Sequence, residues 1–146
     1  MTQYEAIVGD VANASGARIA IAPDRIAEIS VGGTIVLVKP VDAAETAVTL
    51  FAVLIAEGVG EAEMRKALEM SLFGRDTAGG SIGLFVDSLI YSVDLPLDGL
   101  AAAAFAERLV QFADDVRRIS GALSSPGTAE NGAGAHPAGR FEGIMA

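Results

Sequence analysis

Side chains that commonly perform acid–base or nucleophilic chemistry are scarce in this sequence. It contains no cysteine and a single histidine, His136. The lack of cysteine excludes thiolate catalysis, disulfides and cysteine-based metal sites. A catalytic base must be held in a fixed geometry, yet His136 lies between Ala135 and Pro137 in a stretch rich in Gly, Ala and Pro. We therefore expect neither catalysis nor metal binding from this histidine.

Carboxylates are plentiful, but their spacing does not suit general acid–base catalysis. Asp114 and Asp115 are neighbours in a predicted helix, and adjacent helical residues do not face each other. Asp87 and Asp94 approach each other in a predicted hairpin, like the carboxylate pair of a glycosidase. Such chemistry would also need an aromatic platform for a sugar, and the sequence has no tryptophan and only two tyrosines. We interpret Asp114 and Asp115 as part of a solvated face.

Two glycine motifs begin like phosphate-binding loops without completing them. The run from Gly32 to Lys39 lacks the Gly-Lys-Ser/Thr ending of a Walker A loop. Gly58 and Gly60 begin a dinucleotide fingerprint between a strand and a helix, but Glu63 replaces its third glycine. A nucleotide-using enzyme stays open as an alternative, although glycines at a strand–helix corner explain the pattern more simply. The overall expectation is a protein that is not an enzyme and has no catalytic residue, metal site or cofactor.

Hydrophobic periodicity predicts the elements that position these residues. An amphipathic helix is expected between Thr2, its N-cap, and Gly16, its C-cap. Strands at 25–31 and 34–38 form a hairpin that turns on Gly32-Gly33. The other elements are a strand at 46–56, a helix at 61–73, strands at 81–86 and 89–95, and a helix at 100–123 with Asp98 as its N-cap. The order α-β-β-β-α-β-β-α favours an α+β fold, with helices packed on a twisted antiparallel sheet.

The composition indicates a protein that binds another protein. Hydrophobic residues make up 51% of the 146 residues and the mean hydropathy is +0.45, which is more apolar surface than one small domain can bury. The predicted strands at 34–38 and 46–56 are apolar on both faces. This pattern suits a core, a dimer interface or a groove for an extended peptide. Met70 and Phe73 lie off the main face of the second helix and leave apolar surface for a partner.

Charge and targeting signals narrow the choice of partner and compartment. The net charge of −9 disfavours binding to nucleic acid and to anionic membranes, and it attracts basic partners. The longest charge-free apolar run, 46–56, is too short to cross a bilayer, so no membrane insertion is expected. Glu5 and Asp10 stand where a signal peptide would carry basic residues. We therefore expect a cytoplasmic protein.

The chain divides into a domain at 1–123 and a tail at 124–146. The tail is rich in Gly, Ala, Ser and Pro, a composition typical of flexible segments. Near its end, Phe141-Glu-Gly-Ile-Met145 gathers large apolar side chains among small and polar ones. This segment is either a short docking motif or a loose end, and the sequence leaves both interpretations open.

One longer segment carries a family resemblance. Residues 79–97, Gly-Gly-Ser-Ile-Gly-Leu-Phe-Val-Asp-Ser-Leu-Ile-Tyr-Ser-Val-Asp-Leu-Pro-Leu, resemble class I type III secretion chaperones, the Tir-chaperone-like family. In that family a Gly/Ala-rich entry leads to a Leu-Gly-Leu strand, a hairpin and a strand ending in Leu-Pro-Leu. The sequence departs from the family at Ile82-Gly83-Leu84, at Asp94 in place of an arginine, and in lacking the tryptophan of the last helix. The element order agrees over nearly the whole domain, and the last helix supplies similar anchors in Phe105, Leu109 and Phe112.

The resemblance implies an ATP-independent chaperone that binds the N-terminal region of a secreted effector in extended form and keeps it soluble and secretion-competent. It also implies a homodimer in the bacterial cytoplasm. The implied dimer interface uses the second helix and the fourth strand beside it, with Leu68, Leu72 and Phe73. The implied effector-binding residues are Ile29, Val31, Ile35 and Leu37. The residues leave open a second possibility, a small dimeric regulatory scaffold of the roadblock or profilin-like kind that binds a folded GTPase-like partner.

Overall fold

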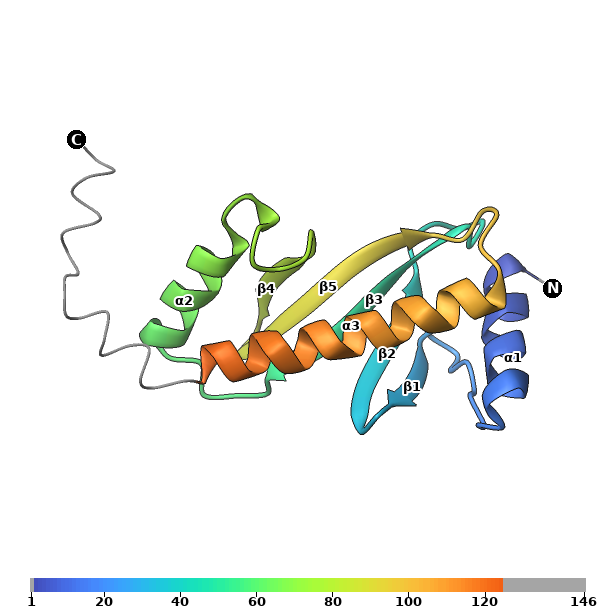
Figure 1. Cartoon of the computed structure of the whole chain (residues 1–146), viewed down its shortest axis with the longest axis horizontal. Helices are drawn as coiled ribbons and strands as arrows, with labels where there is room; N and C mark the ends of the chain where they lie inside the picture. The colour runs from blue at the N-terminus through green and yellow to red at the C-terminus, as the bar shows by residue number, and fades with distance from the viewer. Residues whose placement is uncertain (1, 125–146) are drawn as a thin grey trace.

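The computed structural model describes residues 2–124 and confirms the predicted α+β fold and order of elements. Within that range, three α-helices accompany one five-stranded antiparallel sheet (Figure 1). The helices are α1 (Gln3–Ser15), α2 (Glu61–Ser71) and α3 (Ala102–Leu123), and a 3-10 turn, η1 (Leu72–Gly74), follows α2. The strands are β1 (Ala27–Val31), β2 (Thr34–Pro40), β3 (Ala47–Ile55), β4 (Ser81–Phe85) and β5 (Ser88–Pro96).

The strands lie in the order β1-β2-β3-β5-β4, and each neighbouring pair is antiparallel. β1, β2 and β3 form a meander, β4 and β5 form a hairpin, and β5 joins the two by pairing with β3. Because residues paired across strands share a face of the sheet, the register sorts the side chains. Val38 and Leu50 meet on one face, whereas Leu37 and Phe51 meet on the other.

The core lies on one side of the sheet. Helix α3 runs along that face, and α1 packs beside α3 at one end of the molecule (Figure 1). The ring of Phe112 stacks on that of Tyr91, with centroids 5.1 Å apart. Helix α2 lies at the opposite end, where it contacts β4 and α3. The buried stripe of α3 consists of Phe105, Leu109, Phe112, Val116, Ile119 and Leu123.

Both ends of α1 are set by the residues that the sequence predicts. The Thr2 hydroxyl accepts a hydrogen bond of 3.1 Å from the Glu5 amide, and the Glu5 carboxylate accepts one of 3.2 Å from the Thr2 amide. This reciprocal pair is a capping box, which satisfies donors at the start of a helix. Gly16 ends the helix at a φ of 70°, a conformation that glycine adopts without steric cost.

The predicted start of the last helix is wrong. Helix α3 begins after Ala101, which makes no side-chain cap. Asp98 instead lies in a tight turn, in which the amide of Leu100 donates to the carbonyl of Leu97 over 2.9 Å. The turn ends β5 and redirects the chain, so the helix starts three residues later than an Asp98 cap implies. The strand boundaries differ from the predictions by at most two residues, as is usual at strand ends.

In the part of the chain that the structure describes, no helix is both long and apolar enough to cross a membrane. The predicted tail, apart from Ser124, lies outside the described residues, and with it His136 and the segment from Phe141 to Met145.

Candidate protein-binding surfaces

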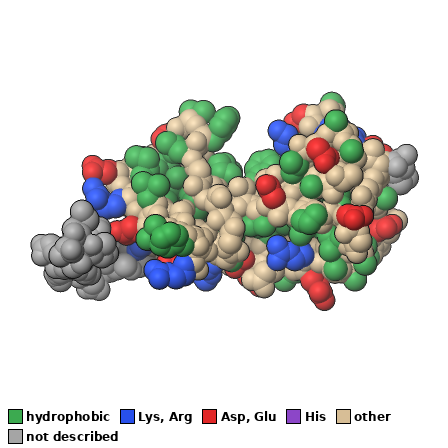
Figure 2. All heavy atoms as spheres, turned by 90° about the horizontal axis from the view of Figure 1, so that it is seen from above, with side chains coloured by type: hydrophobic (Ala, Val, Ile, Leu, Met, Phe, Trp, Pro, Cys, Tyr) green, Lys and Arg blue, Asp and Glu red, His purple; other side chains and the backbone are tan. Residues whose placement is uncertain are grey.

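Large apolar side chains are exposed at the end of the molecule that carries α2 and β4. Figure 2 shows hydrophobic side chains gathered on this half of the surface. Phe73 is 93% exposed and Val86 is 85% exposed. Monomers rarely leave so many large apolar groups together in water, which indicates a contact with another protein. We call this the α2–β4 surface, and it comprises Leu68, Leu72, Phe73, Leu84, Phe85 and Val86.

Two members of the α2–β4 surface also have strained backbones. The φ angle is 58° at Phe73 and 57° at Val86, in the left-handed region that bulky and β-branched residues rarely occupy. Such a conformation costs about 1–3 kcal/mol. Val86 adopts it in the two-residue turn that joins β4 to β5, where a hairpin favours a positive φ. Phe73 gains no burial in return within the monomer, which points to a contact outside it.

Helix α2 buries a different side from the one that the sequence indicates. Ala67 and Met70 are its buried residues, on the side by which it contacts β4 and α3. The prediction that Met70 is available to a partner is therefore wrong. Leu68 is 73% exposed, and the helix ends at Ser71 rather than Phe73. The structure leaves all three predicted dimer residues exposed at this end: Leu68, Leu72 and Phe73.

A second surface feature, with both apolar and polar lining, lies at the other end, between α1, α3 and β1. It is a groove of about 590 Å³, which we call the α1–β1 groove. Ile29 lines it but is only 5% exposed, so its side chain belongs to the core and offers little surface. Val31, further along β1, is partly exposed. The apolar lining comprises Val11, Ile19, Ile29, Val31, Leu109 and Val110.

The other two predicted effector-binding residues lie on the opposite face of the sheet. Ile35 pairs with Ser30 and Leu37 pairs with Glu28, so both side chains point away from the core. Ile35 is 46% exposed. The four predicted residues thus flank β1 from both faces, two in the α1–β1 groove and two across the sheet. β1 is an edge strand whose first residue, Ala27, is bridged by Ile21, so the outer backbone groups beyond Ala27 can also pair with an added strand.

The open face of the sheet carries a third feature that the sequence did not single out. A hollow of about 470 Å³, here called the sheet-face groove, crosses β2, β3, β5 and β4. Phe51 on β3 was one sign of it, because an apolar residue on both faces of a strand needs a second covering surface. The lining comprises Ile26, Lys39, Phe51, Ser81, Gly83, Leu84, Phe85, Ile90 and Ser92.

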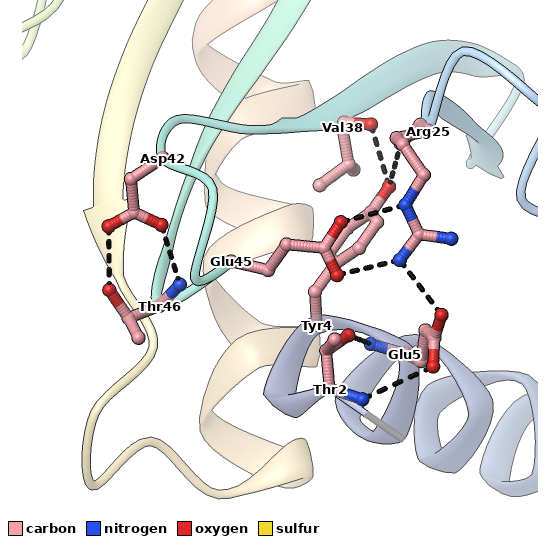
Figure 3. A network of polar contacts seen from close by, with 8 residues as sticks. All are labelled: Thr2, Tyr4, Glu5, Arg25, Val38, Asp42, Glu45 and Thr46. Carbon is pink, nitrogen blue, oxygen red and sulfur yellow. Dashed lines mark hydrogen bonds and ion pairs between the residues drawn. The ribbon is translucent and has the colours of Figure 1, made fainter.

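A polar cluster fixes the α1 end of the molecule (Figure 3). The guanidinium of Arg25 donates to both oxygens of Glu45, over 2.7 and 2.6 Å, and to Glu5 over 2.9 Å. The same guanidinium lies 5.7 Å from the centre of the Tyr4 ring. The Tyr4 hydroxyl lies 2.8 Å from the carbonyl of Arg25 and 2.9 Å from that of Val38. This Arg25 cluster ties α1 to the segment before β1 and to the loop between β2 and β3.

Ionisation in the Arg25 cluster follows from these contacts. The hydrogen bond from Arg25 lowers the pKa of Glu45, and the hydrogen bond from the Thr2 amide, followed by that from Arg25, lowers the pKa of Glu5. Burial raises the pKa of Tyr4 to about 12. The two carboxylates are therefore charged and the phenol neutral at physiological pH. The cluster therefore has a structural role, holding three segments together. No local sequence signal pairs Arg25 with a residue twenty positions away.

The candidate chemical groups are engaged in structural roles. The Asp87 carboxylate accepts from the Gly58 amide over 2.9 Å, and that of Asp94 accepts from the Thr49 hydroxyl over 2.6 Å. At the start of α2, where a dinucleotide fingerprint would place phosphate, the Gly60 amide donates to the carboxylate of Glu63 over 2.9 Å. Among residues 2–124, no group of three or more His, Cys, Asp or Glu side chains is placed to hold a metal ion. The surfaces suited to binding are apolar.

The fold is similar to those of solved chains from type III secretion chaperone complexes. The chaperone SycH of Yersinia pestis, solved with a stable fragment of YscM2, is 15% identical with a TM-score of 0.60, over 80% of this chain and 98% of that one. SchA, from the HopA1–SchA chaperone–effector complex, is 12% identical with a TM-score of 0.65, over 81% and 93%. SpcS of Pseudomonas aeruginosa, from its complex with ExoT, is 19% identical with a TM-score of 0.58, over 80% and 96%.

The resemblance read from the sequence is therefore confirmed at the level of the fold. No protein-family model matches the sequence, and no curated protein matches it significantly.

Proposed function

We propose that this protein is a chaperone for a type III secretion effector. The observation that carries the proposal is the shared fold with SycH, SchA and SpcS, each solved with a bound partner chain. The apolar surfaces described above are consistent with it, because they suit an unfolded polypeptide better than a small molecule or nucleic acid. The Asp87 carboxylate accepts from the Gly58 amide, and the Glu63 carboxylate occupies the start of α2 where a phosphate would bind. Both contacts are consistent with the proposed role, which involves neither catalysis nor ATP.

The proposed effector segment is extended and binds along β1. An added strand can pair with the outer edge of β1 beyond Ala27, which Ile21 already bridges, and its side chains then alternate between the two faces of the sheet. On one face they reach Val31 in the α1–β1 groove, and on the other they reach Ile35 and Leu37. Ile29 contributes from beneath, as the floor of the groove. The N-terminal region of the effector is the segment we expect here, as the family resemblance implies.

The proposed assembly is a homodimer through the α2–β4 surface. Burying Phe73 and Val86 against a second copy would offset both their exposure and their backbone strain. In a two-fold interface each residue is used twice, so a small surface can supply a large stabilisation. A dimer also places two β1 edges on one particle, which suits a long extended chain.

In this proposal the chaperone works by mass action in the bacterial cytoplasm. Binding lowers the free concentration of an aggregation-prone segment, and no cofactor takes part.

The test is purification of the protein from its native host, followed by proteolysis of whatever accompanies it. The expected result is a larger partner from which a short N-terminal fragment survives digestion, because only the bound segment is shielded. Val31→Asp and Ile35→Asp should each abolish recovery of that fragment, since a charge cannot be desolvated there without a counter-ion. Val41→Asp, at an exposed valine of the loop after β2, is the matched control and should retain it.

An intact, folded partner after proteolysis would contradict the chaperone proposal and favour the scaffold alternative. Equal recovery of the fragment with Val31→Asp, Ile35→Asp and Val41→Asp would instead move the effector site away from β1.

A further inference from the structure

The sheet-face groove combines apolar walls with a single type of charge. Phe51, Ile90 and Phe85 provide apolar area from three different strands. Among the described residues that line it, Lys39 is the one charged group, in a protein with a net charge of −9. Such a lining matches a short segment that has two or three large apolar side chains and one carboxylate.

The chain itself contains a segment of that chemistry outside the described residues. Between Ser125 and Arg140 the sequence has no large apolar residue, and then Phe141, Ile144 and Met145 follow within five positions. Glu142 lies between them and supplies the carboxylate. The segment is therefore complementary to the sheet-face groove in both apolar character and charge.

The connecting chain is long enough to reach. The sixteen residues from 125 to 140 span up to about 50 Å when extended, whereas a folded domain of this size has a radius of gyration of about 14 Å. The structural alignments use 93–98% of the neighbours' chains but only 80–81% of this one. Roughly a fifth of this chain thus lies outside those alignments.

We propose that residues 141–145 bind in the sheet-face groove of the same chain, with Phe141, Ile144 and Met145 against Phe51, Ile90 and Phe85 and with Glu142 near Lys39. The segment then covers the open face of the sheet in place of a helix. This inference is separate from effector binding, because the groove is lined by Lys39, Phe51 and Ile90 rather than by the edge of β1. It shares the open face with Ile35 and Leu37, and it shares Phe85 with the α2–β4 surface.

Disulfide trapping in the full chain tests the proposal without interference, because the protein has no cysteine. One variant carries Ser81→Cys, in the groove, with Gly143→Cys, between the apolar anchors. The matched control carries Ser81→Cys with Ala133→Cys, which lies on the same tether but before the anchors. An unbound tether would favour the control, because its linking chain is shorter and its effective concentration higher. The proposal predicts the opposite order, with the Gly143→Cys pair forming at least about 10-fold faster in glutathione buffer.

A further arm separates binding from chance proximity. Adding Phe141→Ser and Ile144→Ser to the Gly143→Cys variant should reduce its rate of disulfide formation to that of the control. Hydrogen exchange should then be faster in β4 and β5 of the chain that carries these two serines and no cysteine.

Three results would overturn the proposal: equal or slower linking at Gly143→Cys, linking that is insensitive to the two serines, or covalent dimers on a non-reducing gel in place of an internal link. The last result would assign the segment to the groove of a second copy. The effector proposal is tested at Val31 and Ile35, so the failure of one proposal is distinguishable from the failure of the other.

Discussion

The two ends of this molecule differ in how their apolar and polar side chains are satisfied. At the α1 end, a capping box, a bidentate ion pair and a buried tyrosine satisfy the polar groups within the chain, and the apolar side of α1 is buried. At the α2–β4 end, the largest apolar groups face outward and two of them stand on left-handed backbone. Both ends belong to one sheet, so the difference is not one of fold class.

The comparison shows which end satisfies its side chains within the monomer and which end leaves them exposed to a partner. Arg25 and Glu45 also have left-handed backbones, with φ angles of 71° and 58°, but their strain is offset by the ion pair that they make with each other. At Val86 the positive φ belongs to the turn between β4 and β5, whereas at Phe73 no contact among the described residues offsets it. A strained, exposed phenylalanine indicates an interface, whereas the strain at Arg25 and Glu45 supports contacts within the monomer.

The largest expected effect is on assembly. Phe73→Ser should convert the proposed dimer to a monomer, because losing about 2 kcal/mol of apolar burial at each of two copies raises the dissociation constant about 1000-fold. Val41→Ser removes an apolar side chain that is 53% exposed at the α1 end and should leave the mass unchanged. Analytical ultracentrifugation at micromolar concentration gives the answer. A wild-type protein that is already monomeric would contradict the proposed interface.

The next effect tests whether β4 is firmly docked on β5. A Cβ added at Gly80 would lie 2.6 Å from the Tyr91 ring and 2.7 Å from the Ser92 carbonyl, whereas one at Gly83 would meet nothing within 4 Å. Gly80→Ala should therefore reduce the free energy of unfolding by about 2–3 kcal/mol. Gly83→Ala, within β4 and three residues after Gly80, should change it by less than about 0.5 kcal/mol. Urea titration of both variants, with Phe73→Ser present to remove dimerisation, measures this difference. Equal effects would mean that β4 shifts freely.

The Arg25 cluster should make the α1 end sensitive to acid. The folded protein lowers the pKa values of Glu5 and Glu45, so the unfolded chain binds more protons in acid. The stabilisation is then complete above the ordinary glutamate pKa of about 4.3 and is lost as the pH falls below it.

Glu45→Gln should lower the midpoint of thermal unfolding by several degrees at pH 7, and should flatten its decline between pH 5 and pH 3. Glu28→Gln, at an exposed carboxylate of β1, is the control and should leave both unchanged. A decline in acid that Glu45→Gln does not alter would assign the acid sensitivity to other groups.

The contribution of Tyr4 to stability depends on pH in the opposite direction. Because burial raises its pKa to about 12, its contribution is complete below about pH 10 and is lost as the pH rises further.

The smallest expected effect concerns strain at the α2–β4 end. Val86→Gly relieves a left-handed valine, but glycine also gains freedom in the unfolded chain, so a net stabilisation of about 0.5 kcal/mol is expected in the monomer. Val53→Gly, at an exposed valine within β3, should destabilise by about 1 kcal/mol instead. Chemical unfolding in the Phe73→Ser background compares them. Destabilisation by Val86→Gly would show that this side chain has contacts within the monomer.

Much of the fold could be predicted because its signals are local. The capping of α1 needs only Thr2, Glu5 and Gly16, and the Gly32-Gly33 turn needs only its two strands. The start of α3 was missed because a turn after Pro96 competes with Asp98 for the same backbone groups. The sheet-face groove was not predicted either, since it requires side chains from four strands to meet.

The sequence by itself determined the order of elements, the lack of cysteine chemistry and the resemblance to secretion chaperones, because these depend on periodicity, turn residues and composition. Only the tertiary structure decided which apolar residues face outward. It buried Ile29 and Met70, exposed Ile35 and Leu68, and paired Arg25 with Glu45. Burial depends on which distant element packs against a face, and a one-dimensional pattern does not contain that information.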